Sequence, residues 1–357
     1  MITISLCMIV KNEEPVLARC LESAGLIADE IIVVDTGSTD RTKEIASRFT
    51  ERVYDFSWED DFAAARNFAF SKASMEYCLW LDADDVFLPA DREAFLELKN
   101  TLSHDIDVVM MRYHIAFDGD GNPTFSYYRE RLLKNVPQAR WAGEIHEVIA
   151  PFGKIMHSEI AVTHKKEGPG DPDRNLRIFE KLRSKGKTLE PRQQFYYARE
   201  LYYHRRYRDA IAAFTAFLET GRGWVENEID ACRHLGLCRR ALGEMDEAVR
   251  ALLRSFEYAA PRAETCCDLG QCFLERGDAA TAAFWYELAL TRKRDDTSGG
   301  FVLPDCYGYL PSIQLCVCYD RLGEREKAIE YNERAASFKP DAEPVRLNRA
   351  YFAGQKL

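Results

Sequence analysis

A spacing of 34 residues recurs in the second half of the sequence and constrains its fold more strongly than any other feature. Three pairs of small residues are separated by this distance: Gly236 and Gly270, Gly243 and Gly277, and Ala248 and Ala282. A period of this length is typical of a two-helix unit, which cannot bury its apolar face alone and stacks on its neighbours. The second half is therefore predicted to be an all-α stack of helical hairpins.

The same register continues on both sides of these central copies. An earlier copy is marked by residues 197–210 and a later one by residues 315–340. The spacing from Ala282 to Ala328 is 46, one period plus twelve, so we place an insertion within 292–308. The pattern resembles tetratricopeptide repeats, about four of them over residues 191–357, and this resemblance implies a solenoid with an extended concave face.

The insertion contains residues 299–304 (Gly-Gly-Phe-Val-Leu-Pro), which are too apolar for a solvent-exposed loop without a packing role. We expect them to cover a cleft, to hold a partner or to pack between two domains.

The first half alternates strand-like and helical segments. Apolar runs at 2–10, 30–34, 53–54 and 79–81 predict strands, and the stretches 16–21, 43–49 and 62–73 predict helices between them. This alternation favours an α/β fold with a mostly parallel sheet that is covered on both faces. Residues 107–164 complete this domain, and their basic stretch 129–134 lies either near bound phosphates or at a solvated strand edge.

Acidic residues follow directly after one of the predicted strands. The run 79–81 (Leu-Trp-Leu) ends on Asp82, Asp84 and Asp85. Ligands of α/β sheets bind at the carboxyl ends of the strands, and grouped carboxylates suit a hard divalent cation. An alternative interpretation is an acidic turn that leads into a helix, with Asp85 or Asp91 as its N-cap.

The order of strand, acidic turn and helix is typical of nucleotide-binding folds. The loops contain neither the G-x-G-x-x-G nor the G-x-x-x-x-G-K-[ST] pattern, so neither a dinucleotide fold nor a P-loop is supported. They offer instead Asp35 after the second strand, Arg66 on a helix, and the pair Asp82 and Asp84. This set suits a nucleotide diphosphate that is held through its base and ribose, with a metal ion on the pyrophosphate.

Four short segments resemble the successive motifs of family 2 inverting glycosyltransferases of the GT-A fold. They occur in the family's order: 7–13 (Cys-Met-Ile-Val-Lys-Asn-Glu), 33–40 (Val-Val-Asp-Thr-Gly-Ser-Thr-Asp), 65–67 (Ala-Arg-Asn) and 82–85 (Asp-Ala-Asp-Asp). The resemblance covers about the first 165 residues. It implies a GT-A, Rossmann-like domain at 1–168, followed by a linker and connecting helix at 169–190.

The resemblance also implies the roles of individual residues. The donor nucleotide sugar would be bound by Val10, Lys11, Glu13, Asp35, Arg66, Asp82 and Ala83. Asp35 and Arg66 would contact the base, while Glu13 and Asp82 would lie on the base or ribose side. Asp84 would bind Mg²⁺ or Mn²⁺ together with Asp82 and His164, and Asp85 is either a second acid or a helix cap.

The acceptor side of the site is expected in residues 141–147 (Trp-Ala-Gly-Glu-Ile-His-Glu). An inverting transferase needs a general base, for which carboxylates are the usual choice. We predict Glu147 as this base with Glu144 as its rival, since the two would share one face if the segment formed a helical turn. His146 either orients a neighbouring carboxylate or takes part in catalysis.

Composition restricts the class of partner and the cellular compartment that we expect for the protein. The net charge of −10 argues against a nucleic-acid partner. The eleven cysteines include no C-x-x-C pair and fall within apolar patterns, which is typical of buried thiols in a reducing compartment. No signal peptide and no membrane-spanning run is apparent, so we expect a cytoplasmic location.

Together these patterns predict a metal-dependent transferase. The sugar would move from a nucleotide diphosphate sugar, expected to be a UDP-sugar, to a Ser, Thr or Cys side chain of a peptide or protein. The combination of domains resembles bacterial peptide glycosyltransferases, with the acceptor held on the concave face. Residues 343–352 are expected either to cap the solenoid or to pair with a second copy in a homodimer. The alternatives are a transferase that elongates a glycan or lipid-linked acceptor, and a non-catalytic adaptor that senses nucleotide sugars.

Overall fold

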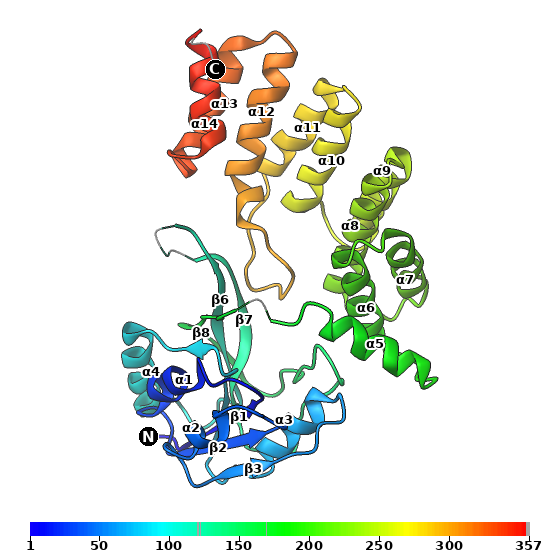
Figure 1. Cartoon of the computed structure of the whole chain (residues 1–357). Helices are drawn as coiled ribbons and strands as arrows, with labels where there is room; N and C mark the ends of the chain where they lie inside the picture. Colours follow the sequence, from blue (N-terminus) through cyan, green and yellow to red (C-terminus); the bar gives the residue numbers. More distant parts are fainter. Residues whose placement is uncertain (120, 122, 169, 355–357) are drawn as a thin grey trace. The chain divides into compact units, whose positions relative to one another are not determined.

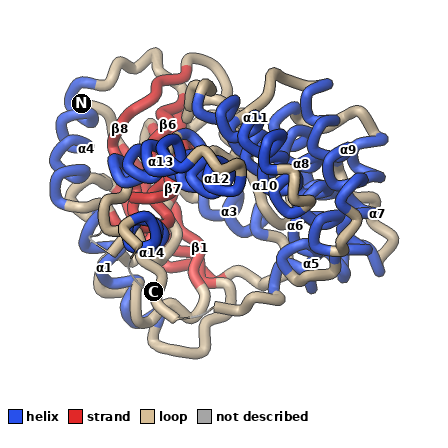
Figure 2. Tube along the Cα trace, turned by 90° about the horizontal axis from the view of Figure 1, so that it is seen from above, coloured by secondary structure: helices blue, strands red, loops and turns tan. Residues whose placement is uncertain are grey.

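The computed structural model describes residues 1–119, 121, 123–168 and 170–354, which form two compact units, Met1–Lys185 and Gly186–Leu357 (Figure 1). This division falls within the stretch 169–190 that the sequence assigns to a linker and connecting helix. In the described part of the chain all strands belong to the first unit, and the second consists of helices and loops (Figure 2).

The first unit contains one mixed sheet of eight strands in the order β3-β2-β1-β4-β7-β6-β8-β5. The strands are β1 (Ile4–Val10), β2 (Glu30–Asp35), β3 (Val53–Asp55), β4 (Tyr77–Trp80), β5 (Asp85–Val86), β6 (Val108–Phe117), β7 (Pro123–Lys134) and β8 (Ile155–His164). The pairs β1–β2, β2–β3, β1–β4 and β6–β8 are parallel, whereas β4–β7, β6–β7 and β5–β8 are antiparallel. The predicted α/β class with a mostly parallel sheet is confirmed.

Five helices accompany this sheet in the first unit. They are α1 (Leu17–Ala24), α2 (Thr42–Ala46), α3 (Phe62–Phe70), α4 (Pro89–Thr101) and α5 (Arg174–Ser184). Alternate residues of a strand point to opposite faces, and in β4 Leu79 packs in a core with α1, α2 and α4, while Trp80 packs in another with α3. The sheet is thus buried on both sides, as its continuous apolar strands require.

The structure decides two of the alternatives that the sequence leaves open. The N-cap of α4 is Leu88, so neither Asp85 nor Asp91 caps this helix, and Asp91 instead accepts a hydrogen bond from the backbone of Ala161. The basic stretch 129–134 belongs to β7, which lies between β4 and β6 and is therefore no solvated edge.

The second unit is built from successive pairs of helices. The pairs are α6 (Pro191–Tyr203) with α7 (Tyr207–Glu219), α8 (Val225–Ala241) with α9 (Met245–Arg254), α10 (Ala263–Glu275) with α11 (Ala279–Leu290), and α12 (Tyr309–Arg321) with α13 (Arg325–Phe338). The helix α14 (Glu343–Phe352) follows, and the short 3₁₀ segments η1 (Ser255–Glu257) and η2 (Pro304–Tyr307) lie between helices. The predicted period of 34 therefore corresponds to one helix pair.

Close packing explains the repeated glycines. A Cβ atom on Gly236 would lie 2.6 Å from the side chain of Leu252, and one on Gly270 would lie 2.7 Å from that of Tyr286. In each case the glycine lets the first helix of a pair approach the second. Gly243 and Gly277 serve another purpose, because they adopt positive φ angles of 78° and 82° in the turn between the two helices.

Two further observations concern the chain as a whole. All eleven cysteines are buried and form no disulfides, in agreement with their apolar surroundings in the sequence. Within the described ranges, no helix is both long and apolar enough to cross a membrane.

Candidate active site

A cavity of about 1170 Å³ opens at the carboxyl ends of the parallel strands of the first unit. Nine of the predicted site residues line it: Val10, Lys11, Glu13, Arg66, Asp82, Asp84, His146, Glu147 and His164. These residues come from five separate segments of the chain. Asp35, Ala83 and Glu144 are not among the residues that line the cavity.

Hydrogen bonds join the loop after β1 to the loop after β2. The Asn12 side chain accepts from the backbone N–H of Thr39, and the backbone N–H of Asn12 donates to the Ser38 hydroxyl, 2.9 Å away. The backbone N–H of Glu13 donates to the Thr42 hydroxyl at 2.7 Å. These bonds explain why the two sequence motifs occur together, because each loop fixes the position of the other.

Asp35 ends β2 and is almost fully buried. Its Oδ1 atom accepts hydrogen bonds from the backbone N–H groups of Gly37 and Ser38, and Gly37 adopts a φ of 103° that favours glycine. The Oδ2 atom is buried and has no hydrogen-bond partner in the protein. A buried oxygen in this state is costly unless a ligand donates to it.

Arg66 lies on α3 and joins two carboxylates of the cavity. Its Nη2 atom donates to Asp82 and its Nε atom to Glu147, both at 2.7 Å. The guanidinium group also lies between two indole rings, 5.0 Å from the centroid of Trp80 and 4.8 Å from that of Trp141.

Charge pairing sets the ionisation of this group. Burial disfavours the charged forms, but the Asp82 and Glu147 carboxylates outweigh it and raise the pKa of Arg66 above its ordinary value. Burial likewise opposes ionisation of Asp82, yet Arg66 and Arg131 lower the pKa of that carboxyl below its usual range. Asp82 is therefore held as a carboxylate by the guanidinium groups beside it.

The predicted acceptor segment forms a tight loop. Two backbone hydrogen bonds between Ala142 and Val148 close it, with lengths of 2.9 and 3.1 Å. His146 has a left-handed φ of 51°, and its ring stacks near that of Phe179. The helical turn that would place Glu144 and Glu147 on one face is thus not formed, and only Glu147 of the two lines the cavity.

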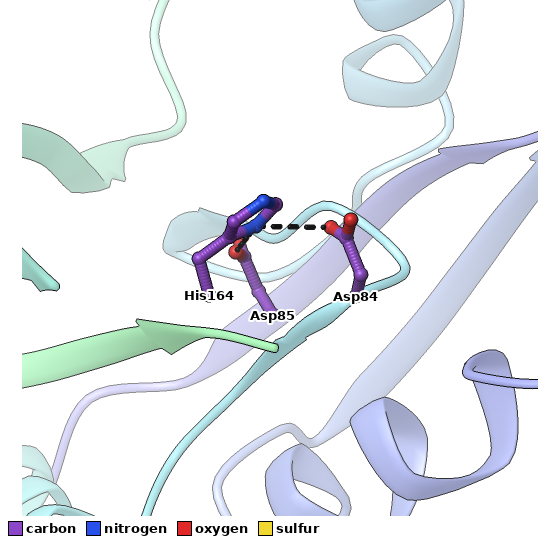
Figure 3. Close-up of side chains that lie close together, drawn as sticks. All are labelled: Asp84, Asp85 and His164. Atoms are coloured by element: carbon purple, nitrogen blue, oxygen red, sulfur yellow. Dashed lines mark ion pairs between the residues drawn. The ribbon is translucent and has the colours of Figure 1, made fainter. Parts of the chain in front are cut away.

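Asp84, Asp85 and His164 converge at the end of β4 and β8 (Figure 3). One ligand atom from each lies within 4.8 Å of the others. His164 Nδ1 is 3.3 Å from Asp84 and 3.5 Å from Asp85, and the Tyr113 hydroxyl lies 3.1 Å from the same nitrogen. Hydrogen bonding to Asp84 and then Asp85 raises the pKa of His164 to about 10, so the ring is protonated at neutral pH when no cation is bound.

Two carboxylates and one imidazole are a suitable ligand set for a divalent cation. The Oδ1 atom of Asp85 is buried without a hydrogen-bond partner, which leaves it available to such an ion. Asp82 differs from the other acids in that its Oδ1 atom is bound by Arg66.

Arg131 is a residue of the site whose role the sequence did not reveal. Both it and Asp85 are 0% exposed, and its Nη1 atom donates to Asp85 at 2.9 Å and to the backbone oxygen of Trp80 at 3.2 Å. Its guanidinium group lies 3.9 Å from the ring centroid of Trp80 and 4.3 Å from that of Tyr113. An arginine beside apolar Leu132 and Leu133 in a strand was the one signal of such a buried pair.

Glu13 is the carboxyl group of the cavity with the most unusual ionisation. Burial, together with the nearby charges of Asp84 and Asp82, raises its pKa from 4.5 to about 7. At neutral pH the group is thus partly protonated, and a protonated carboxyl donates a hydrogen bond as well as accepting one.

The helix α5 supplies another wall of the same cavity. Its Lys181 forms an ion pair with Asp60, and the guanidinium of Arg174 lies 5.1 Å from the ring centroid of Phe62. Both contacts are with the segment just before and at the start of α3, so the helix belongs structurally to the first unit.

The first unit is an α/β domain with a cavity at the carboxyl edge of its sheet. Residues 5–161 match the family model described as "Glycosyl transferase family 2". The first unit is therefore a family 2 glycosyltransferase domain, as the four sequence motifs predicted, and a domain of repeated helix pairs follows it.

Two curated relatives are similar to parts of this chain. A TPR repeat-containing protein of Synechococcus elongatus is 37% identical over 150 residues, 42% of this chain and 36% of that protein. The SPbeta prophage-derived glycosyltransferase SunS of Bacillus subtilis is 27% identical over 225 residues, 58% of this chain and 51% of SunS. The chain thus spans between about a third and a half of the length of these relatives.

A third relative belongs to glycan synthesis by its name. The lipopolysaccharide core biosynthesis glycosyltransferase LpsC of Rhizobium meliloti is 34% identical over 163 residues, 43% of this chain and 58% of LpsC.

Substitution of the two neighbouring acids distinguishes the carboxylate that balances a buried arginine from the one that does not. Asp85→Ala leaves the Arg131 charge buried without a partner, so we expect it to lower the free energy of unfolding by about 3–5 kcal/mol. Asp84 is 21% exposed, and Asp84→Ala is the matched variant with a smaller expected loss, because its partner His164 is partly exposed and keeps Asp85 as a second partner. Urea unfolding followed by circular dichroism measures both values, and equal losses would contradict the assignment.

The raised pKa of Glu13 predicts a dependence of stability on pH. Because the folded state favours the neutral carboxyl, its contribution to stability is lost as the pH rises from about 4.5 to about 7. Glu13→Gln cannot ionise, so the variant should gain stability relative to the unaltered chain over this interval and keep that gain at higher pH. Urea unfolding at pH 5 and pH 8 with EDTA present measures the gain, and an equal difference at both pH values would refute the prediction.

Proposed function

We propose that this protein transfers a sugar, with inversion, from a nucleotide diphosphate sugar to a nucleophilic side chain of a peptide or protein. The convergence of Glu13, Arg66, Asp82, Asp84 and Glu147 in one cavity supports this function most directly. The cavity lies at the carboxyl edge of a family 2 domain, where α/β sheets bind their ligands.

On the donor side, the partly protonated Glu13 lines the cavity and can donate to a hydroxyl or carbonyl of the nucleotide. Asp35 is buried and does not line the cavity, so its proposed contact with the base rests on the family resemblance. Arg66 and Asp82 line the same cavity as Glu13 and form an ion pair. Val10, Lys11 and Ala83 are proposed to contact the nucleotide through their place at the ends of β1 and β4.

Mg²⁺ or Mn²⁺ is proposed to bind Asp84 and His164, with Asp85 as a further ligand and Asp82 close by. Two carboxylates and an imidazole fit such an ion, and the ion would replace the proton that His164 holds in its absence. The chemistry that the ion supplies is neutralisation of the negative charge on the diphosphate leaving group.

Transfer requires one bond to form and one to break. The acceptor oxygen or sulfur attacks the anomeric carbon while the bond from that carbon to the diphosphate oxygen breaks. The nucleotide diphosphate leaves with the bonding electrons, and the acceptor proton passes to Glu147. Glu147 is favoured over Glu144 because it lines the cavity, and His146 is proposed to fix the loop that presents it.

The acceptor has two candidate classes. The repeat domain favours a peptide or protein, because stacked helix pairs form an extended binding surface. The relationship to a glycosyltransferase of lipopolysaccharide core biosynthesis favours a glycan acceptor. Purified protein incubated with UDP-sugars and either a peptide library or oligosaccharides distinguishes them, since transfer changes the mass of only one acceptor class.

The role of Asp84 is tested by release of nucleotide diphosphate from a panel of nucleotide sugars with Mn²⁺. Asp84→Ala should reduce both donor hydrolysis and transfer by about 100-fold or more, because the charge of the leaving group is no longer balanced. Asp105→Asn, at an exposed acid that pairs with Lys154, is the control and should retain full activity.

Two results would overturn this assignment. One is calorimetry that finds unchanged UDP-sugar and Mn²⁺ binding by Asp84→Ala. The other is the absence of any nucleotide release by the unaltered protein across the panel, which would favour the nucleotide-sugar sensor over the enzyme.

The choice between the two glutamates requires a second pair of variants. Glu147→Gln should lower the transfer rate by about 10²–10⁴-fold while the donor affinity changes little, because a general base acts only in the chemical step. Glu144→Gln should remain within about threefold of the unaltered enzyme. Single-turnover kinetics measures the transfer rate, and titration with the donor measures its affinity. A larger loss of transfer rate in Glu144→Gln than in Glu147→Gln would reverse the assignment.

A further inference from the structure

The insertion before α12 lies on the first helices of the repeats. The ring of Phe301 is 4.0 Å from the guanidinium carbon of Arg199 on α6, and the backbone N–H of Leu303 donates to Glu264 on α10 at 2.8 Å. Between them, Gly300 lies against Glu226 on α8. Residues 299–303 therefore cross three successive first helices, whose contacting residues we call the first-helix face.

The two glycines of the insertion match this surface closely. A Cβ atom on Gly299 would lie 2.8 Å from the ring of Trp224, and one on Gly300 would overlap the Glu226 carboxylate and lie 2.9 Å from Nη1 of Arg262, closer than van der Waals contact allows. Glu226 and Arg262 form an ion pair across α8 and α10. The surface therefore fits a peptide segment that has glycines at the positions of Gly299 and Gly300 and an aromatic residue at the position of Phe301.

Charged groups beneath Phe301 are incompletely paired. Asp230 is buried, and its Oδ2 atom has no hydrogen-bond partner, although Arg199 Nε lies 3.9 Å away and His234 Nδ1 lies 3.2 Å away. The Nε atom of Arg199 is also buried without a hydrogen-bond partner. Buried polar atoms in this state form part of a site that hydrogen bonds can complete.

The next repeat differs at the equivalent positions. Arg233 is 34 residues after Arg199, and its Nε atom forms an ion pair with Asp268 at a distance of 2.5 Å. By contrast, Nε of Arg199 lies 3.9 Å from Asp230, and the ring of Phe301 lies over its guanidinium face. The site is therefore specific to the first pair of repeats.

We propose that the first-helix face binds an extended peptide in which small residues precede an aromatic one, and that residues 299–301 occupy this site as a built-in ligand. Arg199 recognises the aromatic ring through its guanidinium face. Glu264 keeps its hydrogen bond from the backbone of Leu303, which lies outside the displaced residues. The incoming peptide displaces residues 299–301, while Cys306 and Tyr307 remain anchored in the core.

The binding of such a peptide does not depend on the transfer reaction. Only its identification as the acceptor rests on the proposed function. A binding assay without donor sugar therefore tests the surface alone, and its failure would leave the transferase assignment untouched.

The probe is a fluorescein-labelled peptide with the sequence of residues 297–304, Thr-Ser-Gly-Gly-Phe-Val-Leu-Pro. The full-length protein is compared with Phe301→Ala, which removes the aromatic anchor, and with Gly300→Val/Phe301→Ala, which also forces the segment off Glu226. Fluorescence anisotropy should show at least about tenfold tighter binding to either variant than to the unaltered protein. The single variant changes only a partly exposed side chain and keeps the test valid if the double variant does not fold.

Arg199→Gln in the Phe301→Ala background should weaken binding about tenfold, and so should alanine at the phenylalanine of the peptide. Arg233→Gln in the same background removes an ion pair at the equivalent position and is the matched control, with affinity expected within about twofold. Equal affinities of the unaltered and Phe301→Ala proteins, or equal effects of the two arginine substitutions, would overturn the proposal.

Discussion

The guanidinium group of Arg66 is the interaction on which the candidate site depends. It donates hydrogen bonds to Asp82, which follows a strand of the sheet, and to Glu147, which lies on a loop 81 residues after Arg66 in the chain. Its two carboxylate partners and the rings of Trp80 and Trp141 hold it in a single orientation. Without this cation the two acids that line one cavity would repel each other, so the segments proposed to bind donor and acceptor depend on the same guanidinium group.

Pairing with a cationic side chain also fixes the neighbouring acids Asp84 and Asp85. Asp85 is fully buried, and the equally buried Arg131 balances its charge, whereas Asp84 is partly exposed and faces His164. Adjacent residues with the same chemistry thus serve different purposes: Asp85 is tied to the interior of the sheet and Asp84 is accessible to a cation. A buried ion pair adds little net stability compared with an apolar pair, but removal of one partner is costly, which keeps the geometry of the cluster fixed.

The repeat domain shows how an insertion can use an existing surface. Cys306 and Tyr307 anchor it in the core between helices, and the preceding glycines and Phe301 extend over the first helices of the repeats. The apolar character of residues 299–304 predicted that they would make packing contacts. These contacts lie within the second unit.

The sequence by itself determined the two kinds of architecture and most of the residues that meet in the cavity. Strand alternation, the period of 34 and the four motifs are local patterns, because they arise from the geometry of single strands, helices and turns. The tertiary structure alone decided which acid pairs with which cation. The Arg66–Glu147 and Arg131–Asp85 pairs join residues 81 and 46 positions apart, and no local pattern specifies such contacts. It also decided that residues 142–148 form a closed loop, since the bonds between Ala142 and Val148 and the packing of Trp141 replace the helical turn that the spacing of the glutamates allowed.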